Sequence, residues 1–446
     1  MFALSEQALA GHALEVRTLR RVTIRLVPIL MTLYFVNYLD RTNLGIAKAQ
    51  LSADLQLSAT MFGLASGIFF IGYVLVEVPS NLALVRFGAR RWLARIAVSW
   101  GVVAVAIAFA PNAGSLLALR FLLGIAEAGL FPGVIFYLGH WFPAAYRARI
   151  VGVFMLAVPL ASAIGTPLAA WLIQAGHGLF GLAGWRFMMI CVGAPAVILG
   201  IICWFYLTDR PADAHWLPDD ERRWLTEVLA AEEHQITQTY HFPLRRALTS
   251  PRVWALAVVY FGVAYGLYAL AFFLPTIIAG FKQTFDVSLS IIEVGLITAV
   301  PYLFATVSMF LWSRHADRVR EHVWHVALPL LLGGLAIPVA LYMRHPVAVM
   351  VPVTIAAVGI YSALPIFWAL PSRFLTGAAA AGGIGLINSF GNIGGFAAPY
   401  ATGALSDLTG SNRAAMWAVG VIMVVCAALV VALRATPAPD REALNG

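Results

Sequence analysis

Twelve long apolar stretches follow one another along this chain of 446 residues. Each is long enough to cross about 30 Å of hydrocarbon as an α-helix. A polar stretch at residues 208–250 separates the first six from the last six, and this division is typical of two parallel repeats. We expect an N-terminal half (1–207), a middle loop (208–250) and a C-terminal half (251–446). The pattern predicts an all-α polytopic membrane protein with twelve transmembrane helices at about residues 26–47, 61–84, 93–110, 115–139, 150–174, 187–207, 253–279, 291–312, 323–343, 346–370, 380–405 and 414–433.

The basic residues are divided unequally between the two sides of these spans. With the N-terminus inside, the outer loops hold only Lys48, Arg186, Lys282, Arg344 and Arg413, and the remaining loop arginines are inside. Because cytoplasmic loops are enriched in basic residues, we expect both termini and the middle loop in the cytoplasm. Arginine clusters after the second and eighth spans, at residues 86–91 and 317–320, support an internal duplication. Within the middle loop, residues 218–229 predict a short amphipathic helix at the membrane surface.

Composition agrees with a membrane protein and excludes several other classes. The chain is 61% hydrophobic and 11% charged, against about 45–50% and about 25% in soluble domains. The net charge of +8 comes from loop arginines rather than one basic face, which argues against nucleic-acid binding. The three cysteines lie in apolar segments and the histidines lie in loops or at span edges, so we expect no disulfide framework, metal or haem. The chain has no nucleotide-binding glycine loop for ATP and no nucleophile–base pair, so the expected protein is not an enzyme and uses no cofactor.

Four charges nevertheless lie inside the apolar segments: Asp40 and Arg41 in the first span, and Arg120 and Glu127 in the fourth. A charge at bilayer depth costs roughly 2.5–3.5 kcal/mol on insertion scales, so such residues usually face a transport pathway or a partner. If the two spans are neighbours, Asp40 can pair with Arg120, leaving Arg41 free to meet an anion. Glu127 is then a buried carboxylate suited to binding and releasing a proton. The alternative is that these charges only fix helix packing, or that Arg41 extends to the surface.

Several uncharged residues are weaker candidates for the same site. Tyr38 precedes Asp40 in the first span, and Tyr73 lies in the middle of the second. Asn388 and Asn392 are four residues apart in a glycine-rich span, hence on one helix face. Their alternative role is ordinary helix–helix packing. Near the inner end of the second span, Glu77 is expected to act in a gate or as a loop ion-pair partner rather than as a proton carrier.

Together these residues resemble one branch of a known family. The chain is similar to the anion:cation symporter branch of the major facilitator superfamily over nearly its whole length, most closely to bacterial tartrate-type and aromatic-acid permeases. One departure is that Val85 stands where the superfamily's loop signature usually has an acidic residue. The resemblance is based on segments 37–43, 77–81, 86–91, 120–129, 141–149, 205–211 and 383–392.

The resemblance implies two six-helix bundles that transport a small organic anion with protons by alternating access. In such carriers the proton-linked carboxylates correspond to Asp40 and Glu127. The residue that meets the substrate carboxylate corresponds to Arg41, and Arg120 balances the acids. The cavity-lining positions correspond to Tyr38, Tyr73 and Asn388.

The expected protein is therefore a proton-coupled importer of an organic anion, such as a tartrate-like dicarboxylate or an aromatic acid. Its expected partners are the anion, protons and the lipid bilayer, and it is expected to be a monomer in the bacterial inner membrane. A sodium-coupled symporter, an anion exchanger and an exporter remain open as alternatives. A metabolite sensor that does not transport is a more distant one.

Overall fold

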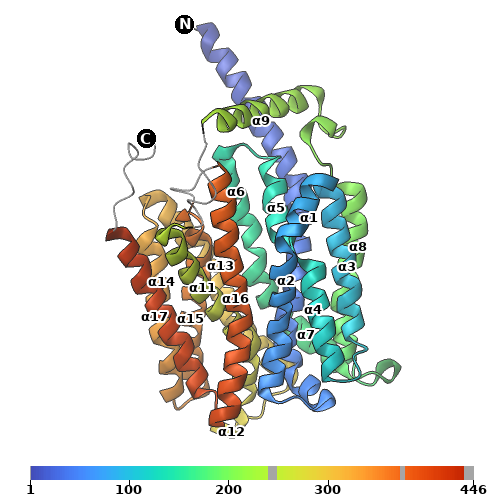
Figure 1. The fold of residues 1–446 in the computed structure, drawn as a ribbon, viewed down its shortest axis with the longest axis vertical. Helices are drawn as coiled ribbons and strands as arrows, with labels where there is room; N and C mark the ends of the chain where they lie inside the picture. The colour runs from blue at the N-terminus through green and yellow to red at the C-terminus, as the bar shows by residue number, and fades with distance from the viewer. Residues whose placement is uncertain (1, 240–248, 372–376, 436–446) are drawn as a thin grey trace.

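The computed structural model describes residues 2–239, 249–371 and 377–435, which form a long helical bundle (Figure 1). Ten helical segments of the described residues are long and apolar enough to cross a membrane. The charged α3 and the glycine-rich α16 run beside them, so all twelve predicted spans are present. The first half consists of α1 (Phe2–Leu55), α2 (Ala59–Phe87), α3 (Ala89–Ile107), α4 (Ala113–Glu127), α5 (Leu130–Gly139), α6 (Ala144–Met155), α7 (Ala157–Ala175) and α8 (Gly184–Tyr206). After α9 (Asp219–Thr239) come α11 (Pro251–Ala279), α12 (Phe281–Phe285), α13 (Ile291–Val319), α14 (Val323–Val339), α15 (Pro346–Phe367), α16 (Gly377–Thr409) and α17 (Arg413–Ala435).

The helices form two bundles that meet along three seams. Within the first half, α1 packs on α7, α2 on α4 and α3 on α8; within the second, α11 packs on α16 and α14 on both α15 and α17. Between the halves, α2 lies against α16, α7 against α13 and α1 against α11. Figure 1 shows α9 and the start of α1 at one end of the bundle and α12 at the other. We call these the α9 end and the α12 end.

Glycines bring the two halves into backbone contact toward the α12 end. A Cβ on Gly63 would lie 2.2 Å from the carbonyl oxygen of Pro399, and one on Gly403 would lie 2.2 Å from that of Ala59. A Cβ on Gly45 would lie 2.6 Å from the carbonyl oxygen of Ala271. Small residues at membrane helix interfaces allow this close approach. The halves are therefore closed against each other toward the α12 end.

The fourth predicted span is broken, because the chain turns between α4 and α5. Gly129 has φ of 89°, a left-handed conformation that favours glycine. A Cβ there would also lie 2.5 Å from the hydroxyl oxygen of Ser80, which donates a hydrogen bond to the carbonyl of Ala128 at 2.6 Å. As a result α4 ends at Glu127.

The predicted helix of the middle loop is present as α9 and extends to Thr239. Its Glu221 is fully buried and forms ion pairs with Arg17 at 2.9 Å and Arg21 at 3.2 Å. Both arginines belong to the N-terminal part of α1, before the first predicted span. The first part of the middle loop is thereby fastened to the N-terminal half.

Candidate functional site

Arg41 lies at the centre of the buried polar residues, where α1 meets both α4 and the second half. Its side chain is 7% exposed. The Nε atom donates to Glu127 Oε1 at 3.1 Å, Nη2 donates to the same oxygen, and Nη1 donates to the hydroxyl of Tyr268 at 2.8 Å. Its guanidinium carbon is also 5.1 Å from the ring centre of Phe69 and 5.7 Å from that of Tyr73, within the range of cation–π attraction. One cation thus links α1, α4 and α11.

Glu127 is fully buried at the last position of α4. Both of its hydrogen bonds from Arg41 end on Oε1. The other oxygen, Oε2, is buried without a hydrogen-bond partner in the described part of the chain. A buried carboxylate oxygen normally has a donor. The two oxygens of this carboxylate therefore differ, since Arg41 contacts only Oε1.

Arg120 holds α4 against α2 rather than meeting an acid directly. Its Nε donates to the carbonyl of Ala65 at 3.1 Å and Nη2 to that of Ser66 at 3.2 Å. The helices approach closely here, since a Cβ on Gly124 would lie only 1.9 Å from the carbonyl oxygen of Phe69. Arg120 is 2% exposed, so its charge acts on the site through a medium of low dielectric constant.

Asp40 points away from Arg41, into the first half. Its Oδ2 accepts a hydrogen bond from Trp100 Nε1 on α3 at 2.5 Å. The expected Asp40–Arg120 ion pair is therefore not formed, and the expectation of a free Arg41 is wrong because Glu127 occupies that cation. The reason is geometric: consecutive residues on a helix point about 100° apart, so Asp40 and Arg41 face different neighbours.

Of the predicted uncharged site residues, the two tyrosines are near Arg41 and the asparagine is on another seam. Tyr38 and Tyr73 are 2% and 3% exposed, and the guanidinium carbon of Arg41 is 5.7 Å from each ring centre. Asn388 on α16 instead donates a hydrogen bond from Nδ2 to Glu77 Oε1 on α2. The structure thus brings Arg41, Glu127, Tyr38 and Tyr73 together, with Asp40 and Arg120 beside them and Asn388 on the α2–α16 seam.

The four charges form a balanced set. Asp40 and Glu127 carry two negative charges, and Arg41 and Arg120 carry two positive charges. All four interact electrostatically. When both carboxylates are ionised, the set is formally neutral. Protonation of either acid leaves one uncompensated guanidinium charge, which attracts an anion.

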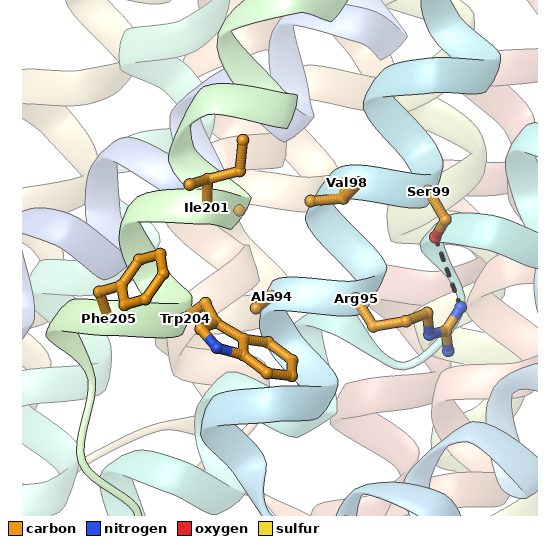
Figure 2. Close-up of a pocket in the computed structure, with 8 residues that line it drawn as sticks. Ala94, Arg95, Val98, Ser99, Ile201, Trp204 and Phe205 are labelled. Carbon is orange, nitrogen blue, oxygen red and sulfur yellow. Dashed lines mark hydrogen bonds between the residues drawn. The ribbon is translucent and has the colours of Figure 1, made fainter.

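A groove of about 450 Å³ lies elsewhere, between α3 and α8. Apolar side chains line it, among them Ile201, Trp204 and Phe205. Figure 2 shows Arg95 directed toward Ser99, to which its Nη1 donates at 3.5 Å, and away from Ile201 and Trp204. The three hydrophobic side chains are 43–79% exposed, as expected on a lipid-facing surface. This groove is separate from the buried charges.

Trp100 of the site was not singled out from the sequence, and Tyr268 was one of three weak candidates in the seventh span, with Tyr260 and Tyr265. Trp100 is one of many aromatic residues in the apolar segments, and only the fold places its indole beside Asp40. Tyr268 is one of several tyrosines in the seventh span. It differs from the other tyrosines of α11 because its hydroxyl meets Arg41 of α1. That contact can be predicted only when the arrangement of the helices is known.

Comparison with known proteins agrees with this architecture. The profile of the Major Facilitator Superfamily matches residues 30–399 and 278–446. A protein named "Putative tartrate transporter" from Agrobacterium vitis is 46% identical over 427 residues, covering 96% of this chain and 96% of that protein. A "Quinolone resistance transporter" from Acinetobacter baumannii is 38% identical, covering 92% and 93%. The inward-facing, unoccupied crystal structure of a bacterial homologue of the human lysosomal transporter Spinster has the same fold, with a TM-score of 0.71 at 19% identity over 93% of this chain and 97% of that one. The chain belongs to the Major Facilitator Superfamily and is a membrane transporter.

Proposed function

We propose that this transporter imports a small organic anion together with protons by alternating access. The observation that carries the proposal is the buried Arg41–Glu127 pair, which also contacts Tyr268 across the boundary between the halves. When a proton neutralises Glu127, Arg41 loses its counterion and can bind an anion, so anion binding is coupled to protonation. Because Arg41 contacts both halves, its change of partner also influences how the halves are positioned.

In this mechanism a proton binds first to Glu127, at the unpartnered Oε2 or at the carboxylate oxygen that Arg41 leaves. The Arg41 guanidinium then exchanges its bond to Glu127 for a bond to the substrate carboxylate. Asp40 provides a second protonation site, held in place by the indole of Trp100. The loaded site has few uncompensated charges, so it crosses to the other side at lower cost than a site with a net charge.

We propose that the substrate is a carboxylate and take tartrate as the first compound to test. Arg matches the planar geometry of a carboxylate, and a relative with 46% identity over nearly the whole chain is named for tartrate transport. Aromatic acids belong to the same chemical class and form the second set of candidates.

We propose that the α9 end lies in the cytoplasm of a bacterial cell, with the protein in the inner membrane. The excess of arginine in the loops at the α9 end supports this orientation. The halves 1–207 and 251–446 would move against each other, with 208–250 connecting them. A monomer suffices for this mechanism, because both halves of the site come from one chain.

An exporter of the same substrate class is the second candidate, since one relative is named for quinolone resistance. Uptake of radiolabelled tartrate and aromatic acids by cells expressing the chain, with and without a protonophore, tests both. Proton-coupled import predicts accumulation that the protonophore abolishes. Accumulation that survives the protonophore would refute proton coupling, and faster loss of preloaded compound would favour the exporter.

A further inference from the structure

A third buried acid, Glu77, lies between the two halves and has no part in the mechanism above. It is 5% exposed and follows Tyr73 by four residues on α2, about one helical turn and 6 Å toward the α9 end. It forms no ion pair in the described part of the chain. Arg41 acts on it only at longer range. A buried carboxylate without a direct ion pair is costly, so its hydrogen-bond partners indicate what it does.

Those partners are the side-chain amides of α16. Oε1 accepts a hydrogen bond from Asn388 Nδ2, and Oε2 accepts one from Asn392 Nδ2 at 3.4 Å. These hydrogen bonds join α2 of the first half to α16 of the second, about one helical turn closer to the α9 end than Tyr73. We call this group, Glu77 with the two amides, the amide clasp.

The same seam has a second carboxylate contact at its other end, with the roles of the helices exchanged. Asp407 on α16 accepts hydrogen bonds from the start of α2: from the backbone N–H of Thr60 at 2.7 Å, from its hydroxyl at 2.6 Å and from the N–H of Ala59 at 3.2 Å. The α2–α16 seam is thus held by one carboxylate toward each end. An alternating-access transporter must loosen one end while the other stays closed.

We propose that Glu77 is a positioning residue that holds the α9 end of the seam. The substrate carboxylate releases Glu77 by accepting the hydrogen bond that Asn388 otherwise donates to it. This inference rests on the proposed function and adds Asn388, which the superfamily resemblance places at a cavity-lining position, to the groups that bind the substrate. Two carboxylates at one buried amide repel each other strongly, because the surrounding dielectric constant is low. Substrate binding therefore separates Glu77 from α16 and weakens the seam at the α9 end only.

Distances between spin labels at the α9 end test the clasp without transport. Labels are placed at Val85→Cys on α2 and Val319→Cys on α13, both exposed, after replacing the three native cysteines with alanine. Glu77→Gln keeps the side-chain size and removes the charge. We expect it to raise the ratio of long to short distances about fivefold, since a hydrogen bond to a charged group is stronger than a neutral one.

Asp407→Ala is the matched control, because it removes the carboxylate at the opposite end of the same seam. It should lower the proportion of long distances at the α9 end. Asn392→Ala supplies a second variant if Glu77→Gln fails to fold, and should act in the same direction as Glu77→Gln. Unchanged distances in Glu77→Gln and Asn392→Ala, or shifts in the same direction as Asp407→Ala, would overturn the clasp.

Tartrate added to the unsubstituted labelled protein tests the competition for Asn388. We expect it to reproduce the shift of Glu77→Gln and to have little further effect on that variant. If tartrate is transported but leaves the distances unchanged, release by substrate is refuted. If tartrate is not transported at all, the proposed substrate fails instead, and the shifts in the variants still decide whether the clasp exists.

Discussion

Replacing Glu127 with glutamine removes the carboxylate from Arg41 while keeping an oxygen that can accept its hydrogen bonds. Complete removal of one partner of a buried ion pair costs about 3–5 kcal/mol of stability. The amide oxygen retains part of the interaction, so we expect a smaller loss and a folded protein. The site charge becomes permanently more positive by one unit, and the variant should still bind the anion.

The effect on coupling is larger than the effect on folding. Loss of one co-transported proton removes about 2.3 kcal/mol of driving force for each 100 mV of membrane potential. Since about 1.4 kcal/mol corresponds to a factor of ten, accumulation falls by roughly fifty-fold, before any contribution of the pH gradient. Exchange of internal for external substrate needs no net proton movement and should continue.

Proteoliposomes with an imposed potential and pH gradient provide the assay, using labelled tartrate for accumulation and for counterflow. Glu293→Gln is the matched control, because that residue caps the start of α13 through Ser290, and glutamine can serve the same cap. Control and unsubstituted protein should accumulate substrate equally. Full gradient-driven accumulation by Glu127→Gln would show that this carboxylate does not carry the coupled proton.

Three further outcomes are expected from other parts of the structure. Tyr268→Phe leaves Arg41 Nη1 without its partner from the second half and should cost about 1–3 kcal/mol, seen as a lower thermal unfolding temperature; an unchanged temperature would contradict the contact. Gly124→Ala places a Cβ 1.9 Å from a backbone oxygen of α2 and should lower the free energy of unfolding by at least about 1–3 kcal/mol. Gly152→Ala is its control: a Cβ there meets no atom within 4 Å, so this variant should unfold at the same temperature as the parent. Burial alone would raise the pKa of Glu321, but hydrogen bonds from an imidazole and two backbone N–H groups lower it on balance. The protection of the amides at the start of α14, which is the exchange rate corrected for its intrinsic dependence on pH, should therefore be high at neutral pH and fall as the pH drops through the lowered pKa; Glu321→Gln should abolish this dependence.

The sequence allows the helices and the buried charges to be predicted, because both depend on local chemistry. Twenty-residue apolar segments have few stable alternatives in a bilayer, and the charges within them are few enough to single out Asp40, Arg41, Arg120 and Glu127. The superfamily resemblance then places these charges around one site. None of these steps requires knowledge of distances between helices.

The pairing of the charges could not be predicted in the same way. Which of two acids meets Arg41 depends on the rotation of α1 against α3 and α4, and that rotation is set by packing along the whole helix. The break at Gly129 has a similar origin, since the turn depends on Ser80 of another helix. The sequence predicts a gate or a loop ion pair for Glu77 but does not reveal its amide partners. Those partners come from a helix about 310 residues later in the chain.

All buried aspartate, glutamate and arginine side chains at membrane depth in the described residues belong to the first half, whereas Tyr268, Asn388 and Asn392 contribute only neutral groups from the second. Under the proposed function, the proton-linked acids and Arg41 are therefore encoded in the first part of the gene, and the neutral groups that face them are encoded in the last part. We expect substitutions of these neutral residues to alter which anion is accepted, while Arg41 and Glu127 of the first half stay unchanged. Such a division would let related carriers diverge in substrate specificity while they keep the same coupling residues.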